Sequence, residues 1–476
     1  MLERLPLYLN GRPTRTRQGL EVLDKYLGKP IAEVSLADDD AVEAALVGGW
    51  NAAEPLRQLP AFRRREILLH CRDRLAQQQT TLVETLITEA GKPRAAALIE
   101  VERALETFRV AAEEATRLDG QFLELQVHPR AVGYRGAVRR FPVGLCTLVS
   151  PFNFPLNLAA HKVAPAIAAG CPWILKPASS TPLSALAIGS ALAETDLPEG
   201  SFSILPASRG TADRLITDPR PRLLSFTGSD TVGWDLYRRA GQKKVVLELG
   251  GNAAAVVDET ADLAFAADRI VAGAFSQAGQ SCISVQRVIA VSSVYDALRT
   301  EIVQRAERVI CGDPKDLQTV VGPLITSLEA DRVRDWLRLA EGAGARRLCG
   351  GPGQDAMILP TVLEAVPENQ PLWCDEAFAP VLVLAAAPDF ESALSAVNLS
   401  RFGLQAGVFT RDIHRAFQAW ECLEVGGVVV GDIPSTRFDH VPYGGVKASG
   451  LGREGVRSAI EEFTEPRTLI VREAAS

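Results

Sequence analysis

Between Val143 and Asp258 the chain alternates short apolar runs with segments of helical periodicity. The apolar runs are VGLCTLVS, PWILKP, RLLSFTG, VVLELGG and AAAVVD, and residues 182–194 form one of the helical segments between them. Short strands that alternate with helices are typical of a parallel sheet covered by helices on both faces. We therefore predict an α/β fold in which a first doubly wound sheet contains these runs.

Sheets of this kind bind ligands beyond the carboxyl ends of their strands. Three of the runs end in polar or glycine-containing turns, at residues 150–153, 176–179 and 226–229. We expect these turns to place ligand-binding groups on a single rim of the sheet.

The alternation starts again over residues 262–450. Helical patterns cover residues 262–275 and 295–309, and strand-like runs lie near 286–291 and 380–384. This restart predicts a second α/β domain.

Two further patterns precede the first sheet. Apolar residues at three- and four-residue spacing predict helices over residues 66–86 and 95–115. Two short alternating segments, residues 121–127 and 136–141, predict a protruding hairpin.

The charge balance limits the classes of partner. With 51 Lys and Arg against 58 Asp and Glu, the net charge is −7, which offers no basic field to phosphate backbones or anionic lipid. The longest apolar tract, residues 156–175, contains Asn, His, Lys and two prolines, which is too polar for a membrane helix. We expect no nucleic-acid partner and no membrane partner.

Cysteine usage and the amino end bear on location. The eight cysteines lie far apart with no CxxC pair, as expected of reduced thiols and not of a disulfide frame or a zinc site. The amino end, MLERLPLYLNGRP, lacks the apolar core of a signal peptide. We predict a cytoplasmic protein without a metal site.

Two residues with catalytic potential lie where predicted elements meet. Cys282 follows Gly279-Gln280-Ser281 in a loop between a helix and a strand. Taken alone, an inert buried thiol explains Cys282 as well as a nucleophile does. Glu248 interrupts an apolar strand, where burial would raise its pKa and make it a usable base. A structural hydrogen-bond network is the alternative for Glu248.

The turns at the predicted rim hold further candidates. Asn153, in the stiff segment PFNFP, is placed to aim an amide at an oxyanion, although ordinary turn chemistry also explains it. Lys176 suits ribose hydroxyls or a phosphate, or is a solvated surface lysine. Residues 226–233, FTGSDTVG, put a glycine turn before a short helix, where backbone N–H groups meet a pyrophosphate. Its GxxxxG spacing is a weak signal by itself.

Together these motifs resemble the aldehyde dehydrogenase superfamily over nearly the whole chain. PFNFP, KPAS, FTGS, LELGGN, GQSC, EAFAP and PYGGVKASGLGREG occur in the family's order, with Glu248 and Cys282 34 positions apart. The resemblance implies the aldehyde dehydrogenase fold, with two doubly wound parallel-sheet domains and a β oligomerisation element. It implies an NAD(P)-binding domain over residues 1–120 and 142–250, a catalytic domain over 251–450, and an oligomerisation element over 121–141 and 462–476.

By this resemblance the chain oxidises an aldehyde to its carboxylic acid with NAD or NADP. Cys282 would attack the aldehyde carbon, while the Asn153 amide and the Cys282 backbone N–H hold the oxyanion. Hydride would leave to the nicotinamide, and water deprotonated by Glu248 would hydrolyse the thioester. The residues implied in cofactor binding are Lys176, Ser179, Phe226, Gly228, Ser229, Glu376, Phe378, Pro151 and Phe152.

Three departures from patterns within the family narrow the prediction. Many NAD-preferring relatives have Glu in place of Ser179, and its absence opens the site to the 2′-phosphate of NADP. Ile283 and Ser284 follow Cys282, so the second cysteine of succinate-semialdehyde dehydrogenases is missing. Arg457 stands where we expect some members to place a second active-site Glu, which leaves Glu248 as the main base candidate.

The substrate is predicted to be a small polar or anionic aldehyde. Residues 156–165 and 435–445 resemble relatives acting on lactaldehyde, glyceraldehyde 3-phosphate and phosphonoacetaldehyde. Arg103, His161 and Arg437 would form an anion clamp. The alternative is that both arginines are surface or interface ion-pair partners and His161 a packing residue.

Two competing functions stay open at this point. A CoA-acylating or succinate-semialdehyde-type dehydrogenase uses the same scaffold, but CoA-acylating relatives commonly lack the base that Glu248 supplies. A non-enzymatic scaffold is disfavoured because Cys282, Glu248, Asn153 and Lys176 are all retained. The hairpin and the terminal strand at residues 466–472 predict strands added across a subunit boundary, and therefore a homodimer or homotetramer.

Overall fold

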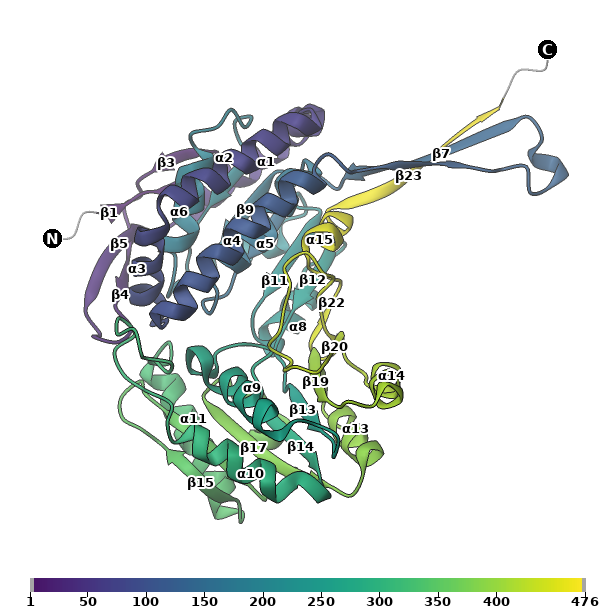
Figure 1. Ribbon diagram of the computed structural model, residues 1–476. Helices are drawn as coiled ribbons and strands as arrows, with labels where there is room; N and C mark the ends of the chain where they lie inside the picture. The colour runs from purple at the N-terminus through teal and green to yellow at the C-terminus, as the bar shows by residue number, and fades with distance from the viewer. Residues whose placement is uncertain (1–3, 473–476) are drawn as a thin grey trace.

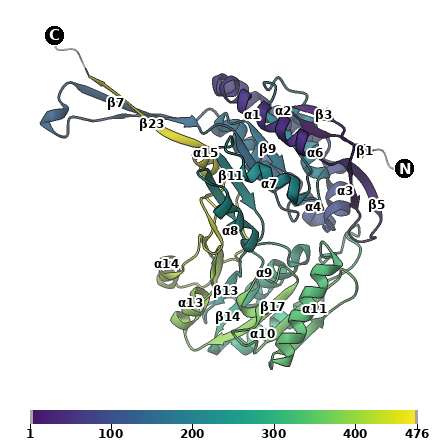
Figure 2. The same ribbon diagram turned by 180° about the vertical axis from the view of Figure 1, so that it is seen from behind.

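The computed structural model describes residues 4–472, so the predictions for residues 1–3 and 473–476 lie outside it. Figures 1 and 2 show two α/β bodies joined side by side, with a long β arm that extends away from the first of them. Among the described residues no helix combines the length and apolar character needed to cross a membrane.

The first sheet has eight strands, of which the central five run parallel. Their bounds are β2 (Leu7–Leu9), β3 (Arg12–Thr14), β8 (Cys146–Val149), β9 (Trp173–Lys176), β10 (Phe202–Ile204), β11 (Leu223–Thr227), β12 (Lys244–Glu248) and β22 (Gly450–Leu451). The order is β22-β12-β11-β8-β9-β10-β2-β3, with antiparallel pairing at both ends. The carboxyl ends of β8, β9, β11 and β12 therefore meet at one rim.

Helices cover both faces of this sheet. One face carries α1 (Asp39–Gln58), α7 (Arg209–Thr217) and α8 (Asp230–Arg239), and the other carries α2 (Ala61–Gln77), α4 (Arg94–Glu114), α5 (Asn157–Ala169), α6 (Leu183–Leu192) and α15 (Val456–Glu462). Side chains of a strand alternate between faces. Accordingly Ile174 packs in the cluster of α1, whereas Trp173 and Leu175 pack in the cluster of α2, α4 and α5.

The second sheet has seven strands in the order β15-β16-β17-β14-β13-β19-β20. Their bounds are β13 (Ala254–Val257), β14 (Arg287–Val291), β15 (Arg346–Gly351), β16 (Leu359–Glu364), β17 (Val381–Ala387), β19 (Gln405–Phe409) and β20 (Gly427–Val430). One face is covered by α9 (Leu263–Phe275), α10 (Ser292–Ala306) and α11 (Ser327–Gly342), the other by α13 (Phe390–Asn398) and α14 (Ile413–Cys422). All pairs but β15 with β16 are parallel. The predicted α/β fold class with two helix-covered sheets is confirmed.

Two expectations about single elements were wrong. The run AAAVVD forms β13, which pairs with β14 and β19 of the second sheet and not with the first. The predicted helix over residues 66–86 is two helices, α2 and α3 (Gln79–Ala90), separated at Gln78. The apolar spacing runs on across this break because both helices pack against the same core.

The arm is a three-stranded antiparallel sheet of β6 (Gly120–Leu123), β7 (Tyr134–Pro142) and β23 (Thr464–Arg472). The predicted hairpin is present, although its first strand ends at Leu123 and a short 3-10 turn, Pro129–Ala131, follows. β7 is the central strand, paired with β23 along its whole length and with β6 on its other side. Both β23 and β6 are therefore edge strands whose outer sides pair with no strand among the described residues. The arm projects well clear of the two bodies (Figure 1).

The remaining elements are small. They are the sheet of β1 (Arg4–Leu5), β5 (Pro30–Ser35) and β4 (Gly19–Leu23), the pair β18 (Phe402–Gly403) and β21 (Val446–Lys447), helix α12 (Pro371–Cys374) and the 3-10 turn η2 (Ser276–Gly279).

Candidate active site

The loop that carries Cys282 leaves α9 through a constrained backbone. Gln277 and Ala278 have φ values of 53° and 55°, in the left-handed region that residues with a Cβ seldom adopt. Such conformations persist where the surrounding structure fixes them, and they concentrate at functional sites. The Cys282 side chain is partly buried and packs against Ile283 and Leu404.

The thiol of Cys282 has a polar neighbour in Tyr443. The distance from Sγ to the tyrosine Oη is 3.2 Å. Burial raises the pKa of the thiol to about 12; the Tyr443 hydrogen bond opposes the rise, and the carboxylates of Glu376 and Glu248 add to it. The sulfur therefore keeps its proton at neutral pH until a base removes it.

The turn with Asn153 is tied to the Cys282 loop by two hydrogen bonds. The Asn153 Nδ2 donates to the Gln280 carbonyl at 3.0 Å, and the Gln277 Nε2 donates to the Asn153 carbonyl. Asn153 is buried. The sequence prediction that Asn153 and Cys282 belong to one site therefore matches a direct contact between their loops.

Glu248 ends β12 as a buried carboxylate. Its side chain is 3% exposed, and neither of its oxygens has a hydrogen-bond partner among the described residues. Burial, with the negative charge of Glu454, raises the pKa of Glu248 well above its ordinary value. The chain after Glu248 packs on the Cys282 loop, since a Cβ on Gly251 would lie 2.3 Å from the Cys282 carbonyl oxygen. The alternative of a structural hydrogen-bond network for Glu248 finds no support in these contacts.

A second buried carboxylate near Glu248 belongs to Glu454, which the sequence reasoning missed. Its Oε1 accepts from the Lys162 Nζ at 3.1 Å and its Oε2 from the Arg437 Nη2 at 3.3 Å. Burial opposes its ionisation, but these cations and His161 lower the pKa of Glu454 to about 2.

The expectation that position 457 marks the place of a second active-site carboxylate was wrong. Arg457 lies on the exposed face of α15, where it pairs with Glu114 at 3.0 Å. Glu454 lies three residues earlier, in the segment GLGREG, before α15 begins. The sequence signal for Glu454 is a glutamate inside the family motif PYGGVKASGLGREG, directly before Gly455.

Arg103, His161 and Arg437 lie in one cluster. Asp439 binds Arg103 and His161, and Arg437 contacts His161. Arg103 donates two hydrogen bonds to Asp439, at 3.0 and 2.7 Å, and the His161 Nε2 lies 2.8 Å from the same carboxylate. Burial opposes ionisation, yet His161 and Arg103 hold the pKa of Asp439 well below its usual range. Burial and the Arg437 charge lower the pKa of His161, which favours its neutral form.

Arg437 is the member of this cluster that contacts Tyr443, the polar neighbour of Cys282. Its Nη2 lies 3.3 Å from the His161 Nδ1, and its Cζ stands 3.7 Å from the centroid of the Tyr443 ring. The guanidinium Nε has no partner among the described residues. Arg437 thus carries a buried donor without a partner and contacts Tyr443, the polar neighbour of Cys282.

A cavity of about 280 Å³ opens at the rim of the first sheet. Lys176, Ser179 and Phe226 line it, together with Arg209 and Arg239. The Lys176 Nζ lies 2.9 Å from the Pro177 carbonyl oxygen and 3.5 Å from the Ser179 Oγ, and burial lowers the pKa of this lysine. The three predicted cofactor residues are therefore neighbours around one hollow.

The other predicted cofactor residues lie along the same rim and across to the second sheet. The Gly228 N–H donates to the Glu248 carbonyl at 3.1 Å, and Ser229 stands at the start of α8 without a side-chain capping bond. The Glu376 Oε1 accepts from the Gly251 N–H at 3.0 Å, and burial raises the pKa of Glu376 to about 7.

Phe152 and Phe378 face each other at this rim. Their ring centroids are 5.8 Å apart with the rings at 81°, and Phe378 has a φ of 49°. Pro151 precedes Phe152 in the turn after β8. The pair joins the Asn153 turn to the segment of Glu376.

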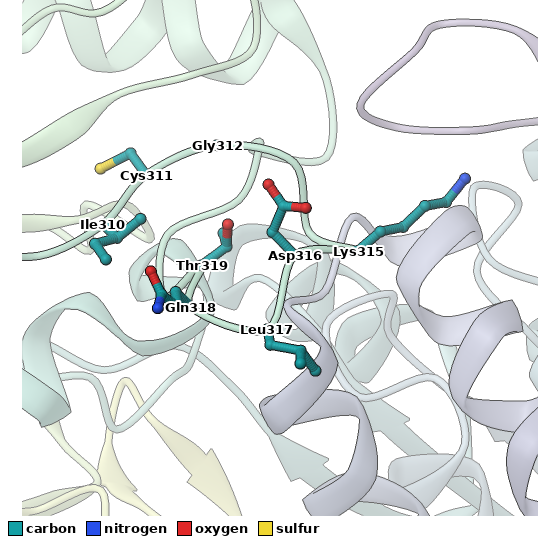
Figure 3. Close-up of a pocket in the computed structure, with 8 residues that line it drawn as sticks. All are labelled: Ile310, Cys311, Gly312, Lys315, Asp316, Leu317, Gln318 and Thr319. Atoms are coloured by element: carbon teal, nitrogen blue, oxygen red, sulfur yellow. The ribbon is translucent and has the colours of Figure 1, made fainter.

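A second cavity, of about 460 Å³, is lined by residues 310–312 and 315–319 and contains none of the predicted site residues (Figure 3). Its loop lies against the amino-terminal helices, since the Arg94 N–H donates to the Pro314 carbonyl. Within residues 4–472 no cluster of His, Cys, Asp or Glu is arranged to hold a metal ion.

Comparison with known proteins identifies the family. The sequence profile of the aldehyde dehydrogenase family matches residues 12–469. The chain belongs to the aldehyde dehydrogenase family. It follows that this aldehyde dehydrogenase oxidises an aldehyde to an acid with a nicotinamide cofactor, and that the resemblance read from the seven motifs is confirmed.

Three relatives of this aldehyde dehydrogenase are informative. The 3-sulfolactaldehyde dehydrogenase of Priestia aryabhattai is 38% identical over 98% of this chain and 97% of its own. The crystal structure of aldehyde dehydrogenase 21 from Physcomitrella patens with the product succinate is 41% identical, covers 100% of both chains and has a TM-score of 0.98. An NADP-dependent glyceraldehyde-3-phosphate dehydrogenase from Bacillus halodurans, complexed with NADP, is 32% identical, covers 99% of this chain and 100% of its own, and has a TM-score of 0.96.

Proposed function

We propose that this aldehyde dehydrogenase oxidises a small anionic aldehyde to its carboxylic acid through a covalent bond to Cys282. The observation that carries the proposal is the linked pair of loops that sets the Asn153 amide beside the Cys282 loop, with the unpartnered Glu248 carboxylate in the same site. A nucleophile, an amide donor and a free base are the groups that acyl chemistry requires.

The first step needs a base, because burial raises the pKa of the Cys282 thiol to about 12. Glu248, whose raised pKa makes it a better proton acceptor than an ordinary carboxylate, takes that proton. The thiolate adds to the aldehyde carbon, and the oxyanion accepts hydrogen bonds from the Asn153 Nδ2 and the Cys282 backbone N–H. A nicotinamide held at this rim would supply the hydride acceptor, and loss of hydride from the tetrahedral carbon would leave a thioester on Cys282.

Hydrolysis of the thioester completes the cycle. Glu248 first releases the Cys282 proton to solvent. It then takes a proton from water, whose oxygen attacks the thioester carbon, and the sulfur leaves as the thiolate and regains its proton from Glu248. The sum is aldehyde, oxidised cofactor and water giving acid, reduced cofactor and a proton. Neither oxygen of Glu248 has a hydrogen-bond partner among the described residues, so the carboxylate is free to accept from the attacking water, which supports hydrolysis over transfer to CoA.

The residues at the rim fit a nicotinamide dinucleotide. Lys176 and Ser179, at the 280 Å³ cavity, would hold the adenosine ribose. Gly228 and Ser229 would present the start of α8 to the pyrophosphate. Glu376 would bind the nicotinamide-side ribose, with Phe378, Phe152 and Pro151 beside the ring.

NADP is proposed as a competent cofactor. No carboxylate stands at position 179, and Arg209, on the cavity wall, has no ion-pair partner among the described residues. Arg239, by contrast, is balanced by Asp213 and Asp235. An uncompensated guanidinium near the adenosine ribose favours a 2′-phosphate. The NADP complex of the Bacillus halodurans relative points the same way.

Arg437 is proposed as the countercharge for the substrate's anionic group. Its Nε is a buried donor without an acceptor, which an anion would satisfy. Arg103 and His161 would support Arg437 without contacting the substrate, because both already bind Asp439. The names of the three relatives mention sulfolactaldehyde, succinate as product, and glyceraldehyde 3-phosphate. Each of these compounds carries an anionic group. The succinate complex keeps succinate semialdehyde as the second candidate substrate.

We also propose that the arm of β6, β7 and β23 joins a second copy of the chain. Phe122 is 95% exposed, and Leu469 and Ile470 are 62% and 59% exposed. Apolar side chains on a thin sheet with open edges are typical of strands that pair across a subunit boundary.

One experiment separates hydrolysis from acyl transfer. The protein is given a sulfonated or carboxylated aldehyde and NADP in ¹⁸O-water, with and without CoA, and the products are analysed by mass spectrometry. We expect acid carrying one ¹⁸O in both cases, and no product from Cys282→Ala. Acyl-CoA as the main product would replace the proposal with the CoA-acylating alternative.

A further inference from the structure

Tyr443 stands at the nucleophile and has no role in the chemistry described so far. Its backbone is fixed to Glu454 by two hydrogen bonds, from the Tyr443 N–H at 3.0 Å and to the Tyr443 carbonyl at 2.6 Å. Its side chain is 6% exposed and packs with Ile283 and Leu404. A phenol held this way has little freedom to turn from the sulfur.

The hydroxyl of Tyr443 has one hydrogen-bond partner among the described residues, the Cys282 Sγ at 3.2 Å. Buried tyrosine hydroxyls normally find a protein partner, and sulfur is a poor one in its neutral state. A thiolate, by contrast, is a charged acceptor and forms the stronger kind of hydrogen bond. The hydrogen bond from the Tyr443 hydroxyl to the sulfur is therefore strongest when Cys282 has lost its proton.

The ring of Tyr443 carries a cation on its face. The Arg437 Cζ lies 3.7 Å from the ring centroid, and Arg437 is 8% exposed at its side chain. A guanidinium over the ring attracts electron density from the phenol and makes its O–H a better donor. The Arg437 charge thus strengthens the hydrogen bond that the Tyr443 hydroxyl donates to the sulfur.

We infer that Tyr443 is a catalytic residue, which donates a hydrogen bond from its Oη to the Cys282 sulfur and stabilises the thiolate that attacks the aldehyde. The inference rests on the proposed function, in which Cys282 is the nucleophile and Glu248 takes its proton. Tyr443 keeps its own proton throughout, because burial raises its pKa well above the ordinary value. The sulfur loses charge to the aldehyde oxygen as the C–S bond forms, so the hydrogen bond acts before that step.

The expected size of the effect follows from two opposing trends. Loss of a hydrogen bond to a charged group raises a pKa by about one to two units. The thiolate fraction then falls about ten- to hundredfold, while the intrinsic reactivity of each thiolate rises with a Brønsted coefficient of about 0.4–0.5. The net loss in rate is about three- to tenfold at each pH below the thiol pKa.

The test compares Tyr443→Phe with wild type and with Tyr237→Phe, a control whose ring lies on α8 and is 45% exposed. Iodoacetamide alkylation is followed between about pH 7 and about pH 10 by peptide mass spectrometry. The Cys282 peptide is the readout, and the exposed Cys422 in the same sample is the internal reference. Tyr443→Phe is expected to slow alkylation of Cys282 about three- to tenfold, with Cys422 and the Tyr237→Phe protein unchanged. Superimposable profiles for Tyr443→Phe and wild type would overturn the inference.

A second variant keeps the test decisive if Tyr443→Phe fails to fold. It also separates the effect of the hydroxyl from the effect of ring packing. 3-Fluorotyrosine placed at position 443 keeps the ring and makes the O–H a stronger donor. It is expected to speed alkylation of Cys282, opposite to Tyr443→Phe, and an unchanged rate would contradict the inference. Failure of the proposed function looks different, because wild-type protein would then form no Cys282 adduct with its aldehyde whatever stands at position 443.

Discussion

Glu248 and Glu454 are two buried carboxylates of one site whose pKa values move in opposite directions. Burial and the Glu454 charge raise the pKa of Glu248 well above its ordinary value. Despite burial, Lys162, His161 and Arg437 lower the pKa of Glu454 to about 2. The two surroundings therefore give the carboxylates different roles: Glu454 stays ionised, whereas Glu248 binds a proton more readily than an ordinary carboxylate.

Replacing Glu248 by Gln removes the base. We expect turnover at neutral pH to fall by about 10²- to 10⁴-fold, the usual contribution of a positioned base. Steady-state formation of reduced cofactor measures this fall. Glu421→Gln, at an exposed position, is the control and is expected to behave as wild type. Unchanged turnover in Glu248→Gln would assign the base to another group.

Replacing Glu454 by Gln shifts the pH profile of turnover. Glu248 works only when deprotonated, so its raised pKa makes turnover fall as the pH drops through that value. Without the neighbouring charge of Glu454, the pKa of Glu248 falls and the acid limb moves to lower pH, by about one unit. A profile of kcat against pH measures the shift. A limb that stays in place, or moves upward, would show that the two carboxylates are not coupled.

Ser179→Glu tests whether position 179 lies near the 2′-phosphate of bound NADP. The added carboxylate beside Lys176 repels NADP, and we expect kcat/KM with NADP to fall about tenfold or more, with NAD changed much less. Arg209→Gln is expected to act in the same direction by removing attraction. Initial rates with both cofactors provide the measurement. Equal losses with NAD and NADP would mean that neither side chain reaches the 2′ position.

Arg437→Gln tests the countercharge. Because Arg437 also faces Tyr443, some loss of kcat is expected with every substrate. The diagnostic quantity is the ratio of kcat/KM for a sulfonated or carboxylated aldehyde to that for lactaldehyde, which we expect to fall about 10- to 100-fold. Arg457→Gln, on the surface of α15, is the matched control. An unaltered ratio would refute the anion site.

The sequence predicts the rim well because strand ends and turns are local features. Lys176, Ser179 and Phe226 line one cavity since parallel strands must end at one edge. Membership of a sheet is not local, and for that reason the pattern of apolar runs placed β13 in the first sheet, although the family resemblance put residues 251–450 in the catalytic domain. Its four residues look alike in either sheet, and only the pairing with β14 and β19 decides.

The missed members of the site depend on contacts between distant segments. Asn157 and Lys162 appeared in the sequence only as polar breaks in an apolar tract, although His161, on the same helix, was predicted as part of the anion clamp. In α5 they are buried, and they contact Asp439 and Glu454 from the carboxyl-terminal part of the chain. A buried lysine in an apolar helix requires a counterion. That requirement predicts a partner, but nothing local in the chain says which carboxylate supplies it.

The arm gives the last prediction. A three-stranded sheet that projects from the body has too little core to be stable by itself, and its exposed Leu469 and Ile470 need cover. Light scattering at micromolar concentration is expected to give a mass of two or four chains. Leu469→Glu with Ile470→Glu is expected to lower that mass, because charge on the open sheet disfavours pairing. Leu399→Glu, 73% exposed at the end of α13, is the control and should leave the mass as it is. A monomeric wild type would mean that the arm is stable without a partner.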